Sequence, residues 1–217
     1  MVGKIAWRQR PVGQNNMSSN SESAVLVPLV QKVDGWHVLF EIRNPDLRWQ
    51  PGDICFPGGR IESYDGDPEV TAVRETVEEL GVDREGVTIW GPLDRVVAVI
   101  GVNIYPYVGE LADQQLSPNH DEVMALFTVP LNWLLAATPR RATMRVLTKP
   151  EDNFPWEQLP SYEREWKKRK TYEVYFYEYG EYLIWGLTAQ ILKNFLEIYR
   201  EIECDQREKK NWLSVTQ

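Results

Sequence analysis

The sequence contains few cysteines and no long hydrophobic segment. Cys55 and Cys204 are its only cysteines and lie far apart. A disulfide-stabilised secreted fold is therefore not expected, and Cys55, in an apolar run, is predicted to be a buried small hydrophobic residue. No apolar stretch approaches the roughly 18 residues that a membrane-spanning helix needs, and the chain does not open with the charged and then apolar segments of a secretory signal. These absences favour a cytoplasmic protein without a membrane partner.

Positive charge is also scarce, because 32 Asp and Glu outnumber 24 Lys and Arg and give a net charge of −8. Proteins that bind nucleic acid generally have a basic surface, so nucleic acid is not expected as a partner. An enzyme with an anionic substrate would need metal ions and a local group of arginines to reverse the sign of the charge at its site. Apolar residues make up 43% of the 217 residues, which suits one globular domain.

The chain is predicted to divide into three parts. Residues 1–23 are polar and rich in Ser and Asn, which predicts a flexible N-terminal arm, and residues 24–200 carry the patterns of a folded domain. The charge rises from Glu201, so residues 201–217 are predicted to form a charged tail. A short helix is expected at 130–137 and a C-terminal helix from Trp185. The predicted strands span residues 24–33, 36–43, 87–93, 95–100, 104–111 and 171–179.

The most informative stretch runs from Phe56 to Val82. A glycine pair, Gly58-Gly59, follows a β-like run, and a polar loop then leads to a predicted helix over 69–80. Asp67 can cap this helix, and Pro68 suits its first position. The chain here has the order strand, glycine turn, loop and capped helix.

Three carboxylates of this helix, Glu75, Glu78 and Glu79, are spaced at i, i+3 and i+4 and therefore project from one face. A hard divalent cation such as Mg²⁺ or Mn²⁺ prefers carboxylate and carbonyl oxygens. The backbone at Gly59 could approach such a cation, because no Cβ stands in the way. The alternative is a solvated acidic helix face, which is the usual meaning of such a charge pattern.

This stretch resembles the Nudix box, G-x5-E-x7-R-E-U-x-E-E-x-G-U with U aliphatic. Gly59 matches the first glycine, and the segment 74–82, RETVEELGV, matches the second half. The interval from Gly59 to Arg74 is one residue longer than the pattern, Asp65 replaces the first Glu, and Thr76 stands where an aliphatic residue is usual. These departures concern the loop and one helix position, and the three glutamates are intact.

The resemblance implies the Nudix α/β/α sandwich, an α/β fold whose mixed β-sheet has the box helix on one face and the C-terminal helix on the other. It implies metal-dependent hydrolysis of a nucleoside diphosphate, with the cofactor Mg²⁺ or Mn²⁺ bound by Glu75, Glu78 and Glu79 and by the carbonyl group of Gly59. Arg74 is expected to support catalysis by holding a loop acid, either Asp65 or Glu62.

A downstream loop supplies the candidate general base. The resemblance favours Glu122, with Asp121 as the competitor, and an ordinary surface acid remains the alternative. A basic segment with Arg140, Arg141 and Arg145 follows later in the chain. It could meet a phosphate or form a solvated strand face.

The residues before the box are similar to a narrower group within the family. The segment 39–59, LFEIRNPDLRWQPGDICFPGG, resembles the L-L-x-x-R-x4-R-x3-G-x3-F-P-G-G pattern of coenzyme A diphosphatases, and IWGLTA at 184–189 is also similar to that branch. The resemblance implies cleavage of coenzyme A or a derivative to 3′,5′-ADP and 4′-phosphopantetheine, with Arg43, Arg48 and Arg60 binding the substrate. The alternatives are an ADP-sugar or dinucleotide diphosphatase and a non-catalytic Nudix-fold binding module. Many Nudix enzymes are homodimers, so a homodimer is expected.

Overall fold

Residues 21–215 are described by the computed structural model, and their side chains as far as Asp205. The first strand begins at Ser21, slightly before the expected domain boundary, and the rest of the predicted N-terminal arm lies outside the described residues. The elements in chain order are β1 (Ser21–Lys32), β2 (Gly35–Arg43), β3 (Ile54–Cys55), β4 (Gly58–Arg60), α2 (Pro68–Leu80), the 3₁₀ turn η1 (Arg84–Gly86), β5 (Val87–Pro92), β6 (Val96–Ala98), β7 (Val102–Leu111), β8 (Val123–Pro130), α3 (Leu131–Ala136), β9 (Arg140–Thr148), β10 (Lys167–Tyr179), β11 (Tyr182–Trp185) and α4 (Gly186–Val215).

The main sheet contains eight strands. Its path is β3-β2-β1-β7-β5, while β4 pairs with β1, β6 with β7 and β8 with β2. β1 and β7 are parallel, from Ser21 opposite Val102 to Val30 opposite Leu111. The other neighbouring strands of this sheet are antiparallel. The sheet is therefore mixed, as the sequence predicted.

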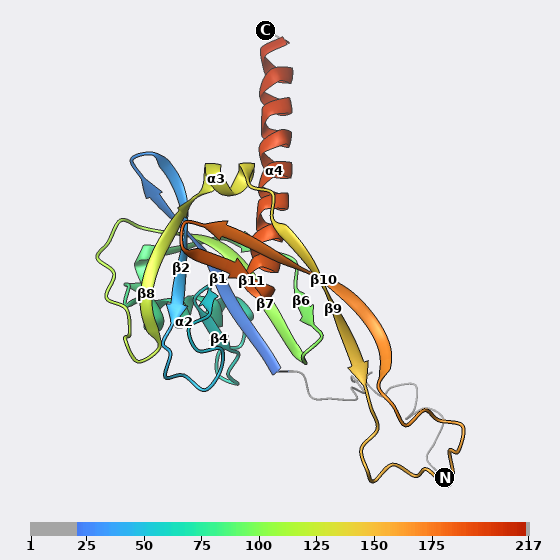
Figure 1. The fold of residues 1–217 in the computed structure, drawn as a ribbon. Helices are drawn as coiled ribbons and strands as arrows, with labels where there is room; N and C mark the ends of the chain where they lie inside the picture. The colour runs from blue at the N-terminus through green and yellow to red at the C-terminus, as the bar shows by residue number, and fades with distance from the viewer. Residues whose placement is uncertain (1–20, 216–217) are drawn as a thin grey trace, which may run out of the picture.

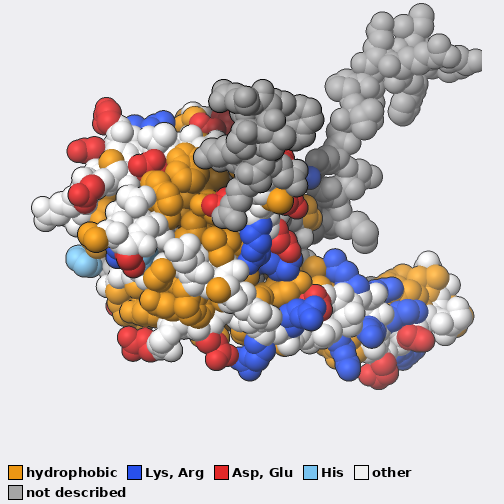
Figure 2. Space-filling model, turned by 90° about the horizontal axis from the view of Figure 1, so that it is seen from above, with side chains coloured by type: hydrophobic (Ala, Val, Ile, Leu, Met, Phe, Trp, Pro, Cys, Tyr) orange, Lys and Arg blue, Asp and Glu red, His pale blue; other side chains and the backbone are white. Residues whose placement is uncertain are grey.

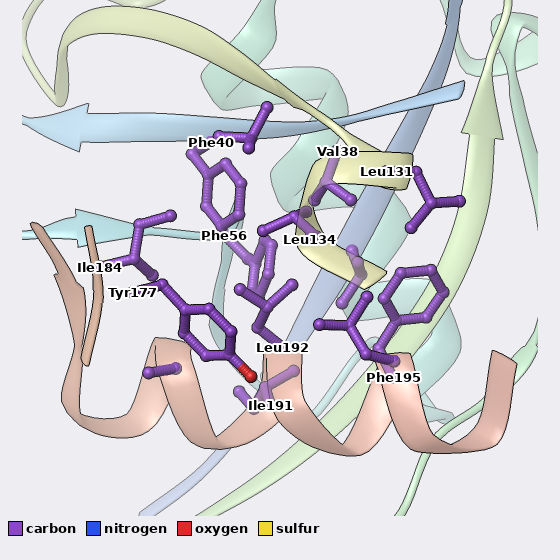
Figure 3. Packing of buried hydrophobic residues seen from close by; sticks show 14 of the residues in the cluster. Val38, Phe40, Phe56, Leu131, Leu134, Tyr177, Ile184, Ile191, Leu192 and Phe195 are labelled. Carbon is purple, nitrogen blue, oxygen red and sulfur yellow. The ribbon is translucent and has the colours of Figure 1, made fainter. Parts of the chain in front are cut away.

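Helices cover both faces of the main sheet (Figure 1). Successive residues of a strand point to opposite faces, so Leu26 packs with α2 while its neighbour Val27 packs in the cluster that contains α4. Figure 3 shows this second cluster, in which Phe40 and Phe56 point toward Leu192 of α4. The α/β/α sandwich expected from the sequence is confirmed.

The helix α2 begins and ends where its sequence predicts. The side chain of Asp67 accepts a hydrogen bond from the backbone N–H of Glu69 at 2.8 Å, and Pro68 occupies the first turn. Gly81 ends the helix with a left-handed φ of 61°, which glycine adopts without steric cost. Ala72 and Leu80 are buried against the sheet. This packing fixes the direction in which the remaining faces of the helix point.

A second sheet, β11-β10-β9, lies beside the main sheet, and its hairpin β9–β10 projects from the body of the molecule (Figure 1). Lys and Arg side chains gather along this projection (Figure 2). The basic segment noted in the sequence forms β9, in which Arg140 pairs with Glu178 at 3.1 Å and Arg141 lies 3.7 Å from Glu173.

The helix α4 runs on to Val215 and so includes most of the segment that was predicted to be a charged tail. Within the described part of the chain, no helix has both the length and the apolar character needed to cross a bilayer.

Candidate active site

The glycine pair of β4 lies directly against α2. The backbone N–H of Gly58 donates a hydrogen bond to Oε2 of Glu79 at 2.8 Å. Gly59 lies so close to Glu75 that a Cβ on Gly59 would overlap the Glu75 carboxylate. The lack of a side chain at Gly59 permits this close approach, whereas a Cβ on Gly58 would meet Ala24 and Val25 of β1. The backbone of β4 and two of the predicted metal ligands are thus parts of one site.

Arg74 and Asp65 connect the loop to the helix. Nε and Nη2 of Arg74 donate to the two oxygens of Asp65, each at 3.0 Å. The Asp65 carboxylate, whose side chain is 1% exposed, also accepts from the Thr71 hydroxyl at 2.7 Å and the Glu62 backbone N–H at 2.9 Å. The guanidinium group holds the pKa of Asp65 well below its usual range.

The expectation that Arg74 binds a loop acid is therefore confirmed, and the acid is Asp65. Glu62 contributes only its backbone N–H to this network. The inserted loop residue has not removed the ion pair.

The second edge of the Arg74 side chain faces the acidic side of α2. Nη1 of Arg74 lies 2.8 Å from Oε1 of Glu75 and 3.1 Å from Oε2 of Glu78. Nη2 also donates to the carbonyl group of Arg60 at 3.4 Å. Arg74 thus orients the box carboxylates, while its interaction with the loop fixes its own position.

The loop before β8 is attached to the end of α2. The backbone N–H of Ser117 donates to the carbonyl of Leu80 at 3.0 Å, and that of Asn119 donates to the carbonyl of Glu79 at 2.9 Å. The carbonyl of Glu122 accepts from the backbone N–H of Asn44 at 2.8 Å. Glu122 is therefore held between the loop that follows β2 and the C-terminal end of α2.

Glu41 of β2 is a site residue that the sequence reading did not propose. Its side chain is 1% exposed, Oε1 accepts a hydrogen bond from the Cys55 thiol at 3.0 Å, and buried Oε2 has no partner in the described structure. Burial raises the pKa of Glu41, and it also raises the pKa of the Cys55 thiol, which stays protonated as a donor. Cys55 is thus a hydrogen-bond donor as well as a partly buried small side chain.

Four side chains form what we call the carboxylate cluster: Glu41, Glu75, Glu79 and Glu122. Burial raises the pKa of Glu79, and the charges of the other three carboxylates raise it further. The charge of Glu122 likewise raises the pKa of Glu41 and of Glu75, after burial as the main cause. Glu122, and not Asp121, is among the main charges that shift the pKa values of these groups, so Glu122 is the acid of this loop that belongs to the cluster.

The described side chains contain no group of three His, Cys, Asp or Glu residues arranged to hold a metal ion. Arg74 holds Glu75 and Glu78, the N–H of Gly58 holds Glu79, and Glu78 is 55% exposed. The donor set nevertheless fits a hard divalent cation, because the cluster consists of carboxylates and the buried Oε2 of Glu41 has no hydrogen-bond partner in the described chain. The ligand roles of Gly59, Glu75, Glu78 and Glu79 stay predictions.

The three predicted substrate-binding arginines differ in burial and in their contacts with the site. Arg43 is half-buried at the end of β2, its Nε donates to the Trp49 carbonyl at 3.4 Å, and its charge lowers the pKa of Glu41. Arg48 is exposed in the following loop and forms no ion pair with any described residue. Arg60 is exposed at the end of β4. Arg43 thus lies near Glu41 of the cluster, and the backbone of Arg60 is bonded to Arg74. Arg48 is available to bind a ligand.

The NUDIX domain model matches residues 21–149. The chain belongs to the Nudix family. This Nudix hydrolase is 35% identical over 208 residues to Nudix hydrolase 3 of Caenorhabditis elegans, a match that covers 91% of this chain and 81% of that protein. It is 37% identical over 135 residues to the peroxisomal coenzyme A diphosphatase NUDT7 of Mus musculus, covering 61% of this chain and 57% of the mouse protein.

The uncharacterised Nudix hydrolase NudL of Pectobacterium atrosepticum is 33% identical to this Nudix hydrolase over 184 residues, with 84% of this chain and 82% of NudL covered. Among solved structures, a MutT/nudix family protein from Enterococcus faecalis gives a TM-score of 0.52 at 16% identity, over 90% of this chain and 68% of that chain. That likeness supports the fold. As a Nudix hydrolase, the protein is a pyrophosphohydrolase, and such enzymes typically use a divalent metal ion.

Proposed function

We propose that this Nudix hydrolase cleaves coenzyme A or a derivative of it to 3′,5′-ADP and 4′-phosphopantetheine. One observation carries the proposal. The arginine-containing loop of the coenzyme A diphosphatase pattern borders the carboxylate cluster, because Arg43 follows Glu41 on β2 and the loop returns to the cluster at Cys55. The likeness to the mouse coenzyme A diphosphatase supports the same substrate class.

In the proposed reaction a water oxygen attacks one phosphorus of the diphosphate, the bond from that phosphorus to the bridging oxygen breaks, and two phosphomonoesters leave. A bound Mg²⁺ or Mn²⁺ would neutralise the negative charge of the phosphates. Glu41, Glu75 and Glu79 would hold it, together with Glu78 and the carbonyl group of Gly59.

Two further residues act on this chemistry without holding the metal. Glu122, which is exposed at the border of the cluster, is the candidate for accepting the proton of the attacking water. Arg74 keeps the carboxylates of α2 in position through its bonds to Asp65, so its role is one of orientation.

The arginines provide the local positive charge that an acidic protein needs for an anionic substrate. Coenzyme A has a 3′-phosphate that ADP-ribose lacks, and a guanidinium group can bind phosphate through two parallel donors. Arg48 is exposed and unpaired within the described residues, whereas Arg43 already bonds to the loop. We therefore propose that Arg48 binds the 3′-phosphate and that Arg43 stabilises the loop in which Arg48 lies.

The test is a set of rate curves for coenzyme A, 3′-dephospho-coenzyme A, ADP-ribose and NADH. Wild type is expected to prefer coenzyme A over the dephospho form in kcat/KM by about tenfold to a hundredfold, since a charged hydrogen bond is worth roughly 1.5–3 kcal/mol. Arg48→Ala should narrow this ratio, while Arg95→Ala, at an exposed arginine in the loop between β5 and β6, should leave it unchanged. Faster hydrolysis of ADP-ribose than of either coenzyme A form would overturn the substrate assignment.

A further inference from the structure

The short strand β3 carries a cysteine that contacts the carboxylate cluster. Cys55 of β3 lies directly opposite Glu41 of β2 in the antiparallel ladder, so the two side chains point to the same face of the sheet. That face is the one covered by α2, because Leu39, two residues before Glu41, packs there. The Cys55 thiol donates to Oε1 of Glu41 at 3.0 Å. The thiol thus holds one of the two oxygens of this carboxylate.

The other oxygen of Glu41 is buried without a partner from the described chain. The side chain of Glu41 is 1% exposed, and its Oε2 accepts no hydrogen bond from any residue that the structure describes. Burying a carboxylate oxygen without a partner costs free energy. The charge of Glu41 raises the pKa of Glu79, which indicates that the two carboxylates are neighbours. Oε2 is therefore available to a cation in the cluster.

The position of β3 is fixed from the opposite face of the sheet. β3 consists of two residues and lies at the end of the strand path, so its pairing with β2 alone holds it weakly. The Thr188 hydroxyl, in the first turn of α4, donates to the carbonyl of Ile54 at 3.0 Å. The side chain of Ile54 packs in the core cluster that contains α4 residues. Ile54 and Cys55 thus connect α4 to the carboxylate cluster through one short strand.

This connection gives a role to a sequence segment that the proposed reaction does not use. Thr188 belongs to the segment 184–189, IWGLTA, which resembles coenzyme A diphosphatases although it lies on the α4 side of the sheet. Ile184 and Ala189 of this segment are buried in the core there. Their burial explains packing alone, whereas the Thr188 hydroxyl bonds to the strand that carries Cys55.

We propose that Cys55 and Thr188 are positioning residues for Glu41. Thr188 holds β3 in place, and the Cys55 thiol holds Oε1 of Glu41 so that Oε2 faces the divalent cation. Groups that bond to a metal-binding side chain from outside fix its direction, and their loss typically lowers metal affinity or activity about tenfold to a hundredfold. This inference rests on the metal-binding role proposed for Glu41 and does not depend on the identity of the substrate.

The experiment removes each donor and then restores it. Cys55→Ala and Thr188→Val remove the donors, whereas Cys55→Ser and Thr188→Ser retain a hydroxyl. Cys204→Ala and Thr143→Val are the matched controls, because both residues are exposed and lie in α4 and β9. The readouts are the dissociation constant of Mn²⁺ measured by calorimetry without substrate, the melting temperature of the metal-free protein, and kcat and KM for coenzyme A.

Cys55→Ala is expected to weaken Mn²⁺ binding and to lower kcat, each by about tenfold to a hundredfold. Cys55→Ser should stay within about threefold of wild type, because a hydroxyl is also a donor. Thr188→Val should weaken Mn²⁺ binding by about twofold to tenfold, which corresponds to one neutral hydrogen bond, and Thr188→Ser should not. A purely structural role would lower the melting temperature and leave the Mn²⁺ dissociation constant as in the controls.

Glu41→Gln decides whether the two residues act through this carboxylate. In the Glu41→Gln background, Cys55→Ala should cause no further loss of Mn²⁺ affinity. An equal loss in both backgrounds would overturn the inference, and so would a wild-type Mn²⁺ affinity in folded Cys55→Ala. A wild-type affinity in folded Thr188→Val would overturn the part assigned to Thr188. Should Thr188→Val fail to fold, the Cys55 variants carry the test.

Failure of the proposed function is recognised separately. If wild type binds Mn²⁺ but does not hydrolyse coenzyme A, the proposed substrate is wrong, and the Mn²⁺ affinities of the variants still decide the inference. If Glu41→Gln binds Mn²⁺ as tightly as wild type, the metal-binding role of Glu41 is wrong and the inference falls with it.

Discussion

The two adjacent glycines of β4 should respond to the same substitution in opposite ways. At Gly58, φ is +155°, and an added Cβ would overlap the carbonyl oxygen of Ala24 and approach Cα of Val25 to 2.6 Å. These obstacles are backbone atoms of a central strand and cannot turn aside. At Gly59 the three atoms nearest to the added Cβ all belong to the carboxylate of Glu75, with Oε2 at 2.7 Å and the other two closer. That carboxylate is the far end of a side chain and can rotate away.

For Gly58→Ala, overpacking costs about 1–3 kcal/mol, and a glycine-favoring backbone conformation forced on another residue adds about 1–3 kcal/mol. In a domain of this size each kcal/mol lowers the melting temperature by roughly 2–4 °C, so a loss of roughly 4–24 °C is expected. A lower hydrolysis rate of Gly58→Ala could come from lost stability or from a displaced site. The melting temperature is therefore the deciding measurement for this variant.

For Gly59→Ala, Arg74 loses its contact with Glu75 but keeps its bonds to Asp65 and Glu78, and the stiffer unfolded chain returns about 0.4–1 kcal/mol. The melting temperature should therefore stay within a few degrees of wild type. Glu75 must leave its place beside β4, however, and a displacement of about 1 Å in a catalytic arrangement can lower the rate on the order of a hundredfold.

Gly91→Ala serves as the control, because nothing lies within 4 Å of a Cβ built on Gly91 in β5. It should leave both melting and rate unchanged. A Gly59→Ala enzyme with the wild-type rate would refute the claim that Glu75 must occupy the space beside Gly59. A Gly58→Ala protein as stable as wild type would refute the packing described for β4 and β1.

The remaining predictions concern the carboxylates and their support. Glu79→Gln should lower turnover by orders of magnitude with a small change in melting temperature, because an amide is a poor ligand for a hard cation; undiminished activity in that variant, or in wild type with excess chelator, would contradict the metal assignment. Arg74→Ala should weaken metal binding measured by calorimetry as well as the rate, since the guanidinium orients Glu75 and Glu78, and normal values of both would show that this orientation is unimportant. Asp65→Asn should destabilise the protein at neutral pH. Because the folded pKa of Asp65 lies below the ordinary value of 3.8, that stabilisation is present above pH 3.8 and is lost as the pH falls below it. Urea unfolding of wild type and variant should thus converge in acid, and a constant difference between them down to the lowest pH would argue against the ion pair as its source.

Local signals explain why the helix α2 and its loop could be predicted from sequence. Asp67, Pro68 and Gly81 mark the two ends of the helix by interactions with their immediate neighbours. The bond between Arg74 and Asp65 spans only nine residues, so Asp65 and Glu62 could both be named from the sequence as nearby loop acids. Features whose causes lie within a few turns of the chain were predicted correctly.

The strand β9 was predicted only as one of two alternatives for the basic segment, because its cause is not local. Its residues are almost all exposed on both faces, so they have no alternation of apolar and polar side chains. The strand forms by pairing with β10, from Arg140 opposite Phe176 to Thr148 opposite Lys167. The long loop between these strands hides that pairing from any reading of a short window. The same pairing extends β10 to Lys167, before its predicted start.

Glu41 was missed for a different reason. Its place in the alternation of β2 correctly put it on the face of Leu39, but a strand pattern cannot tell whether that face meets solvent or a helix. Here α2 and the loop before β8 cover it, so a carboxylate that looks like a surface residue in the sequence is buried with one oxygen unpartnered in the described structure. Burying such a group weakens a fold, and a leucine would pack there at lower cost. A buried carboxylate beside Glu75 and Glu79 therefore has its explanation in the chemistry of the site rather than in the packing of the sheet. An acid directly after a continuous apolar run, as Glu41 follows Val38, Leu39 and Phe40 in β2, is the signal by which such a residue could have been found.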